Sequence, residues 1–378
     1  MRAGEPKQCK CLMSSGKLIS TYRDRCVLVS GHTGFKGGWL CSWLNELGAR
    51  VSGLALNADT QPNLFEALRL ADRVGSYIAD IRDRQAVRRT FDDVRPEIVF
   101  HLAAQPLVRR SYADPLLTFA INIMGTAHVL EAARACPSVR ALVVVTTDKV
   151  YDNREWVWPY REIDPLGGHD PYSASKAAAE VVTAVYQKNL CRGDIAIATA
   201  RGGNVVGGGD WAEDRIVPDI VRAITTGTPI VLRNPRATRP WQHVLELCEA
   251  YLELGARLLD AKNEFAEAWN FGPHDRETLT VSDLTKLVLE AWGRDDHPVS
   301  VQSSPLREAQ TLQLDVAKAL TRLSWRPRLG MREALLWTTQ WYKGYYSRPG
   351  DARVLTKNQI QDFQSLMDLE GAREIATT

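Results

Sequence analysis

The sequence predicts an α/β fold in which a parallel, doubly wound sheet is joined to a smaller C-terminal lobe. From residue 25 to about residue 205, short apolar runs alternate with longer helical patterns. Such runs, rich in β-branched residues, are typical of parallel strands that helices cover on both faces. A glycine-rich turn joins the first run to the first helix, and beyond residue 206 the alternation loosens. We therefore expect a sheet domain and a lobe that covers it.

The composition indicates a globular protein with small-molecule ligands. The formal net charge is only +2 over 378 residues, so neither nucleic acid nor a membrane is expected as a partner. No apolar stretch is predicted to span a membrane. The seven cysteines are scattered, and Cys9 and Cys11 lack the further ligands of a metal site, so we expect no metal and free thiols in a reducing cytoplasm. Residues 1–24 lack the apolar core of a secretory signal and are predicted to be a mobile extension.

The first strand, residues 25–30, leads into the glycine-rich turn, and a helix follows over residues 39–47. Strand, glycine turn and helix in this order predict a dinucleotide site of the Rossmann type. Glycines let backbone N–H groups approach a pyrophosphate at the positive end of the helix, although a turn chosen only for tightness has the same pattern. The expected contacts are Gly31, His32, Thr33, Gly34, Phe35, Lys36 and Gly37.

The second strand, residues 50–56, leaves the choice of cofactor open. An acid near its end would hold the adenosine ribose of NAD. The strand ends at Asn57 instead, and Asp59 comes two residues late. Because Lys36 and His32 could hold a phosphate, NAD is the expected cofactor but NADP stays possible on these residues alone.

The next two strands are expected to complete the cofactor site. The third ends in acids, and Asp80 would hold the adenine amino group or cap the following helix. The fourth, residues 97–104, ends in small residues that let a flat cofactor lie close. A long helix follows over residues 115–135. The remaining expected cofactor contacts are Ile81, Leu102, Ala103, Ala104 and Asn122.

Candidate catalytic residues follow the fifth strand, residues 141–146, which ends at Thr147, Asp148 and Lys149. Tyr172 and Lys176 come next, at i and i+4 on a helix that Pro171 can begin, so both side chains face one way. An ammonium beside the phenol would lower its pKa from about 10 and make it a base for a sugar hydroxyl. A surface tyrosine and lysine on an ordinary helix would give the same spacing.

These motifs, in this order, resemble the extended short-chain dehydrogenase/reductases that modify nucleotide sugars, and within them the 4,6-dehydratases. The resemblance covers roughly residues 25–363. Most 4,6-dehydratases have Asp-Glu where this chain has Asp148-Lys149. The resemblance rests on the glycine turn, Ala103-Ala104, Asn122, Thr147, Tyr172-x-x-x-Lys176, residues 207–211, residues 239–244 and Asn270-Phe271-Gly272-Pro273.

The resemblance implies a cytoplasmic NAD-dependent hydro-lyase of deoxysugar biosynthesis, as for the O-antigen of lipopolysaccharide. Residues 25–205 and 240–275 would form the NAD-binding domain, and residues 206–239 and 276–347 the substrate lobe. Residues 348–378 would form a C-terminal segment, and within it Ile360, Phe363 and Met367 share one helical face, so residues 358–369 are predicted to dock as a helix. Helices 115–135 and 172–189 would pair in a four-helix bundle of a homodimer or homotetramer, through Val181, Val182 and Val185.

The family's chemistry also implies a role for each catalytic residue. Tyr172 would take the O4 proton of the sugar, Lys176 would lower the tyrosine pKa, and Thr147 would orient O4. Asp148 would protonate the departing O6 hydroxyl, or else form a salt bridge with Lys149. Lys149 would be the base at C5 or would stabilise the enolate formed there.

The substrate diphosphate is expected at Arg239 and Asn204, with Arg307 as a second candidate. Two other functions fit much of the pattern. A 4-epimerase would not need Asp148, and a non-catalytic dinucleotide-binding regulator would not need the Tyr172 and Lys176 pair. The nucleotide base is expected to contact Gly209, Asp210, Trp211, Ile216, Val217 and Pro218.

Overall fold

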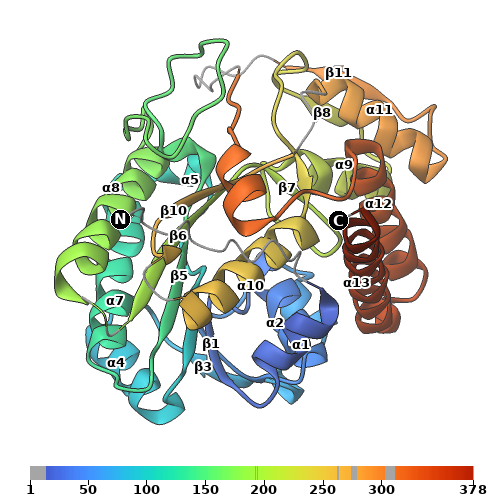
Figure 1. The fold of residues 1–378 in the computed structure, drawn as a ribbon. Helices are drawn as coiled ribbons and strands as arrows, with labels where there is room; N and C mark the ends of the chain where they lie inside the picture. The colour runs from blue at the N-terminus through green and yellow to red at the C-terminus, as the bar shows by residue number, and fades with distance from the viewer. Residues whose placement is uncertain are drawn as a thin grey trace.

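The computed structural model describes residues 14–191, 193, 195–261, 264–273, 279–302 and 311–377. Within these residues, seven parallel strands form the main sheet in the order β10-β6-β5-β4-β1-β2-β3 (Figure 1). The strand order reverses between β1 and β4, so the crevice at their carboxyl ends is where a doubly wound sheet binds its ligands. The strands are β1 (Cys26–Ser30), β2 (Arg50–Ala55), β3 (Gly75–Ile78), β4 (Ile98–His101), β5 (Ala141–Val145), β6 (Ala196–Gly202) and β10 (Ala268–Phe271).

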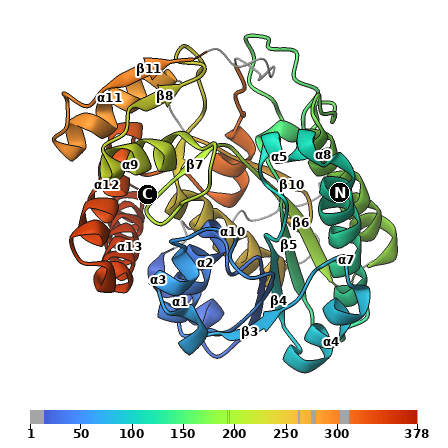
Figure 2. The ribbon, with the colours of Figure 1, turned by 180° about the vertical axis from the view of Figure 1, so that it is seen from behind.

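Helices cover both faces of this sheet, as Figures 1 and 2 show from opposite sides. One face carries α1 (Ser15–Tyr22), α2 (Phe35–Glu46) and α10 (Val244–Ala261). The other carries α4 (Arg84–Val94), α7 (Thr126–Arg134) and α8 (Pro171–Val185). Strand β1 shows why both layers are stable. Val27 and Val29 enter one core and Leu28 the other, as the two-residue repeat of a strand requires.

The smaller lobe is built from the second half of the chain. Strand β8 pairs with β11 in parallel, and α11 packs on both α9 and α12. Strand β7 pairs with β9 and links the lobe to the sheet domain. The elements are β7 (Val205–Val206), α9 (Ile216–Thr226), β8 (Ile230–Leu232), β9 (Gln242–His243), α11 (Val281–Trp292), β11 (Val299–Val301) and α12 (Met331–Ser347).

Shorter elements connect these layers. Helices α3 (Leu64–Ala67), α5 (Val108–Ala113) and α6 (Pro115–Phe119) lie on loops after the strands. The 3-10 turns are η1 (Leu70–Asp72), η3 (Asp148–Val150) and η7 (Pro349–Asp351), and the π-helical turns are η2 (Ala120–Gly125), η4 (Tyr186–Leu190) and η6 (Ala319–Leu323).

The docking helix predicted near the C-terminus is confirmed, and it is longer than residues 358–369. Helix α13 (Ala352–Thr377) buries Ile360, Phe363 and Met367 completely. Phe363 meets Trp43 of α2 with ring centroids 5.7 Å apart, in an edge-on arrangement. The last helix therefore supports the first helix of the dinucleotide motif.

Two predictions about the N-terminal half need correction. Of the extension predicted over residues 1–24, residues 15–22 form α1, because Leu18 and Tyr22 are buried and the Tyr22 hydroxyl donates to the Leu252 carbonyl oxygen at 2.5 Å. Residues 1–13 lie outside the described part. The sequence was predicted to contain no stretch long and apolar enough to span a membrane. The continuous helix Pro115–Arg134 does meet this test by length and composition. Its packing on α8 and α4 buries 44% of its apolar window.

Candidate active site

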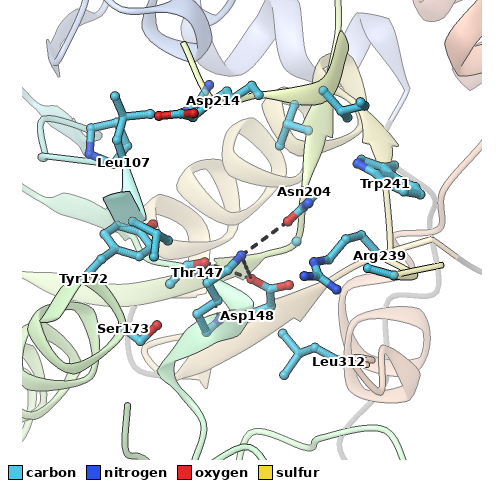
Figure 3. A pocket seen from close by; sticks show the side chains of 18 of the residues that line it. Leu107, Thr147, Asp148, Tyr172, Ser173, Asn204, Asp214, Arg239, Trp241 and Leu312 are labelled. Atoms are coloured by element: carbon cyan, nitrogen blue, oxygen red, sulfur yellow. Dashed lines mark hydrogen bonds and ion pairs between the residues drawn. The ribbon is translucent and has the colours of Figure 1, made fainter. Parts of the chain in front are cut away.

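A cavity of about 800 Å³ opens at the carboxyl ends of the central strands, between the sheet and the lobe. This volume is sufficient for a nucleotide-sized ligand. The sheet domain contributes Thr147, Asp148, Lys149 and Tyr172 to its wall, and the lobe contributes Arg239. Figure 3 shows these side chains turned toward one space, with Tyr172 and Arg239 on opposite sides of Asp148. The structure therefore brings four of the five predicted catalytic residues together at the cavity, and Lys176 is not among the residues that line it.

Thr147, Asp148 and Lys149 form a connected group directly after β5. The Thr147 hydroxyl donates to Asp148 Oδ1 at 2.9 Å, and Lys149 Nζ lies 3.7 Å from the same oxygen. Lys149 Nζ also donates to Asn204 Oδ1 at 3.4 Å. Asp148 is 1% exposed, and its Oδ2 has no hydrogen-bond partner within the described part of the chain. The contact with Lys149 thus leaves one carboxyl oxygen available.

Tyr172 stands at the start of α8, where the Asp170 side chain caps the helix by accepting from Ser173 N at 3.0 Å. Burial raises the pKa of Tyr172 to about 12, and a hydrogen bond between the Thr147 and Tyr172 hydroxyls offsets only part of this effect. The attraction of the Arg215 guanidinium lowers the pKa of Tyr172 as well. The predicted net lowering of this pKa is therefore wrong for this structure.

The state of Lys176, which was predicted to lower the pKa of Tyr172, also differs from the prediction. Its Nζ donates to the carbonyl oxygen of Val145 at 3.1 Å. Burial, and then repulsion by Lys36, lower the pKa of Lys176 to about 7, against the attraction of Glu180. Because both side chains lie in a desolvated site, phenol and amine are each shifted toward the neutral form.

The glycine turn has the geometry of a pyrophosphate cradle. Gly31 has a φ of +82°, and a Cβ on Gly37 would lie 2.1 Å from the Gly31 carbonyl oxygen. A Cβ on Gly31 would lie 2.8 Å from Ala103 N, so the end of β4 passes directly against the turn. Helix α2 begins immediately after Gly34. Only a bare backbone fits at Gly31 and Gly37, which suits close approach by a dinucleotide.

His32 and Lys36 do not provide a cationic phosphate site at the end of β2. His32 Nε2 pairs with the Ser76 hydroxyl at 2.7 Å, and burial lowers the pKa of His32 to about 4, so the ring is neutral near pH 7. Lys36 lines the main cavity instead, 5.9 Å from the Tyr251 ring centroid. Burial lowers the pKa of Lys36 to about 8. Both observations favour NAD over NADP.

The other predicted cofactor residues follow the carboxyl ends of β1, β3 and β4, where their surroundings differ. Asp80 is held by its ion pair with Arg82 at 2.6 Å, and the Thr33 hydroxyl donates to the Leu56 carbonyl oxygen at 2.8 Å. Ile81 is buried in the core beneath Gly125. Phe35 lines the main cavity. The N–H groups of Leu102 and Ala103 both donate to the Ser30 hydroxyl at 3.1 Å, and Ala104 follows them.

Asn122, predicted as a cofactor contact, is 1% exposed, and its side chain is hydrogen-bonded within the protein. Its side chain accepts from Gln105 N at 2.8 Å and donates to Gln105 O at 3.1 Å and Ser175 Oγ at 2.8 Å. It sits in the π-helical turn η2, a feature that is frequent at functional sites. Asn122 thus ties the segment after β4 to α8, one helical turn from Tyr172.

The predicted substrate residues divide into two groups. Gly209 and Trp211 face the core: a Cβ on Gly209 would meet Leu64 at 2.4 Å, and the Trp211 ring lies 5.0 Å from that of Tyr345. Neither residue lines the main cavity, and their predicted contact with the nucleotide base stays a prediction. Arg307 lies outside the described residues. The remaining predicted substrate residues all line the cavity: Asn204, Asp210, Ile216, Val217, Pro218 and Arg239.

Comparison with known proteins identifies the family. The model of the GDP-mannose 4,6 dehydratase family matches residues 28–336. The chain belongs to the GDP-mannose 4,6 dehydratase family. It is 44% identical over 350 residues to the CDP-glucose 4,6-dehydratase of Salmonella typhimurium, covering 91% of this chain and 97% of that relative. It is 32% identical over 247 residues to a dTDP-glucose 4,6-dehydratase of Streptomyces antibioticus, covering 65% and 70%.

Solved structures agree with this family. The UDP-glucose 4-epimerase of Thermus thermophilus, in complex with NAD, superposes with a TM-score of 0.73 at 28% identity. The match covers 84% of this chain and 99% of that one. The dTDP-glucose 4,6-dehydratase DesIV of Streptomyces venezuelae has a TM-score of 0.74 at 24% identity, over 87% and 99% of the two chains, and so shares the fold.

Sequence reasoning missed several charged residues around this family's site. Arg215, the residue before α9, pairs with Asp210 at 2.7 Å and lines the cavity. Glu180 follows Lys176 by one helical turn and forms a buried ion pair with Arg201 at 2.9 Å. The helical spacing of Tyr172, Lys176 and Glu180 was a signal that could have found the last of these.

Proposed function

We propose that the protein is a CDP-glucose 4,6-dehydratase that converts CDP-glucose to CDP-4-keto-6-deoxy-D-glucose. The observation that carries this function is that one cavity holds Tyr172 together with Asp148 and Lys149. An oxidation at C4 needs only a base such as Tyr172, whereas loss of water also needs groups that move protons at C5 and O6. The named function of the Salmonella relative supports CDP as the carrier.

The residues of the glycine turn and of the segment after β4 fit NAD, because the bare backbones of Gly31 and Gly37 let the turn fold tightly against Ala103 and against itself at the N-terminus of α2. They would hold the dinucleotide with its pyrophosphate at the N-terminus of α2. Bound NAD supplies a hydride acceptor for C4 of the sugar and a hydride donor for C6.

In the first half of the reaction the protein moves a proton from O4. Tyr172 accepts it, and the Thr147 hydroxyl orients O4 through a hydrogen bond. Thr147 and Arg215 both lower the pKa of Tyr172 and so oppose the larger effect of burial. Lys176, whose Nζ donates to Val145 O, would hold the nicotinamide ribose.

In the second half the C4 ketone makes the C5 proton acidic, and water leaves across C5 and C6. Asp148 protonates the departing hydroxyl, since its buried Oδ2 is available while Oδ1 contacts Thr147 and Lys149. Lys149 either removes the C5 proton or stabilises the enolate as a cation. A Lys149→Met variant decides this: if it still exchanges the C5 hydrogen of the keto intermediate with solvent, Lys149 is not the base.

The function is tested by incubating the protein and NAD with CDP-, dTDP-, GDP- and UDP-glucose. We expect turnover of CDP-glucose to a 4-keto-6-deoxy sugar, with deuterium from C4 recovered in the C6 methyl group. A C4 epimer formed without loss of water would establish a 4-epimerase instead. No turnover of any of the four sugars, with NAD bound, would favour a regulatory protein.

We also propose that the protein is a cytoplasmic homo-oligomer whose product feeds deoxysugar synthesis, such as that of lipopolysaccharide O-antigen. Apolar side chains are exposed along the helices predicted to form the bundle. They are Leu116 at 76%, Met124 at 53%, Val181 at 56% and Val185 at 47% exposed. A second copy of these helices would cover them. Val182 packs instead against its own core, so it is not part of this surface.

A further inference from the structure

Ser111 is a fully buried serine on α5 that contacts the backbone of Tyr172. Tyr172 N donates to Ser111 Oγ at 3.1 Å, and the Ser111 hydroxyl donates in turn to the Val108 carbonyl oxygen at 2.6 Å. One hydroxyl therefore joins the first turn of the helix that carries the base to the short helix that follows β4.

The N–H groups at the start of α8 show what this contact provides. A helix leaves the N–H groups of its first turn without intrahelical partners. Pro171 has no N–H, and Ser173 N donates to the Asp170 side chain at 3.0 Å. Ala174 N donates to the Asp170 carbonyl oxygen at 2.9 Å. Among residues 171–174, Tyr172 thus has the one backbone donor whose partner in the described structure lies on another element.

A second buried serine holds the other side of the same residue. Ser175 Oγ donates to the Tyr172 carbonyl oxygen at 2.6 Å and accepts from Asn122 Nδ2 at 2.8 Å. Ser175 is also fully buried. The backbone of Tyr172 is therefore held at its N–H by α5 and at its C=O by a side chain that is itself bonded to η2.

The position of this backbone decides where the phenol points. The Tyr172 side chain lines the cavity, and its hydrogen bond with the Thr147 hydroxyl lowers the pKa of Tyr172 against the effect of burial. Hydrogen bonds weaken steeply away from their preferred geometry, so a shift of this turn would weaken that contact. Leu107 and Val108 line the same cavity, and Figure 3 shows Leu107 on the same side as Tyr172. Ser111 thus fixes the phenol relative to one wall of the cavity.

We propose that Ser111 is a positioning residue for proton transfer from the sugar O4, acting through the backbone of Tyr172. This proposal rests on the proposed function, which assigns Tyr172 as the base. Ser111 itself is not among the residues that line the cavity. Its loss should therefore slow the chemical step and leave nucleotide binding nearly unchanged.

The test compares Ser111→Ala with the wild-type protein on the nucleotide sugar that the protein turns over. We expect kcat to fall by about ten- to a hundred-fold while KM changes by less than about two-fold, because a small misplacement of a reacting group costs this much in rate. The low-pH limb of the kcat profile should also move to higher pH, since the displaced phenol loses a bond that lowers its pKa.

Thr183→Ala is the matched control and should keep the wild-type kcat. Thr183 is a fully buried residue of the same helix, about three turns from Tyr172, and its hydroxyl donates to the Ala179 carbonyl oxygen at 2.7 Å. The control loses a buried hydroxyl from α8 without touching the backbone of the base. An equal loss of kcat in both variants would show that Ser111 serves only the stability of the fold.

Adding Ser111→Ala to Tyr172→Phe provides the second arm. If Ser111 acts through the phenol, its loss should cost less than about two-fold in kcat in that background. An unchanged kcat in the single variant, or a loss that adds in full to that of Tyr172→Phe, would overturn the proposal.

Hydrogen exchange at the Tyr172 N–H measures the contact without any substrate. It should become faster in Ser111→Ala, and an unchanged exchange rate would also overturn the proposal. Failure of the proposed function is seen separately, since a wild-type protein that turns over none of the four nucleotide sugars refutes that function whatever the exchange rates show.

Discussion

Tyr172 and Lys176 stand one helical turn apart, and desolvation acts on the two in opposite directions. The pKa of Tyr172 is raised to about 12 and that of Lys176 is lowered to about 7. The resting pair is therefore shifted toward phenol and amine, and the site has to be activated by nearby dipoles and charges. Thr147 and Arg215 both lower the pKa of the Tyr172 phenol and so favour its ionised form.

Lys176 should make stability depend on pH. Its pKa is lower in the folded state than the value of about 10.4 in the unfolded chain, so the unfolded state binds more protons between these values. Unfolding free energy should therefore rise with pH from about 7 toward 10, by at most about 1.4 kcal/mol per pH unit. Urea unfolding of the wild type and of Lys176→Met at several pH values measures how the difference in their unfolding free energies changes with pH. A difference that does not change with pH would contradict the prediction.

Gly37→Ala should impair both folding and cofactor binding. Its Cβ would sit 2.1 Å from the Gly31 carbonyl oxygen, so the turn has to open. We expect at least about ten-fold weaker NAD binding and a lower Tm, because the pyrophosphate cradle is distorted. Calorimetry with NAD measures the first effect. Gly330→Ala is the control, since a Cβ there meets nothing within 4 Å, and equal behaviour of the two variants would refute the argument.

At the scale of elements, Glu180 fastens α8 to the ends of two strands. Its carboxylate accepts from Thr146 Oγ1 at 2.5 Å, from Thr199 Oγ1 at 2.7 Å and from Arg201 at 2.9 Å. Thr146 precedes Thr147, so this one side chain sets the distance between the two catalytic segments. The network continues from Arg201 Nη1 to the Tyr151 hydroxyl at 2.8 Å.

Glu180→Gln should destabilise the protein by about 3–5 kcal/mol, because it leaves the guanidinium of Arg201 buried without a counter-charge. Adding Arg201→Met should restore part of this loss by removing the orphaned charge. Urea unfolding gives both values. Glu131→Gln, which breaks an exposed pair with Arg134 on α7, should cost less than about 1 kcal/mol. Similar losses in the two single variants would show that burial is not the cause.

Sequence was sufficient for the elements whose signals are local. The strand, glycine turn and helix around Gly31 were predicted because φ angles and apolar periodicity act over a few residues. Helix α1 was missed because its stability comes from Tyr22 reaching Leu252, far along the chain. The burial of Trp211 was missed for the same reason, since the residues that bury it lie on α12. Tertiary packing decided both cases.

At the scale of the whole molecule, the cavity is formed only where the lobe meets the sheet. The side chains from Thr147 to Tyr172 could be placed there from the rule that ligands bind at carboxyl ends of parallel strands. Arg109, Asp214 and Arg233, which form ion pairs in the cavity wall, could not, because segments far apart in sequence meet there only in the folded chain. Charge type alone does not indicate which partner each will find.

The proposed assembly through the exposed faces of α6 and α8 yields a prediction at the scale of the whole molecule. Replacing both Val181 and Val185 by Asp should convert the oligomer to monomers, because two charges would be buried in an apolar interface. Sedimentation velocity measures the outcome. Val354→Asp on α13, where the valine is 55% exposed, is the control and should leave the assembly unchanged. An oligomer that survives the double substitution would place the interface elsewhere.

The contact between Phe363 and Trp43 links the last helix to the helix that opens at the glycine turn. A dinucleotide that stiffens α2 should therefore also slow the detachment of α13. Limited proteolysis in the short connection Pro349–Asp351 would then report whether a dinucleotide is bound at the glycine turn, which lies near the start of the sequence. A cut made there would act on the cofactor through the packing of α13 on α2, which includes the ion pair between Lys357 and Glu46 at 3.3 Å.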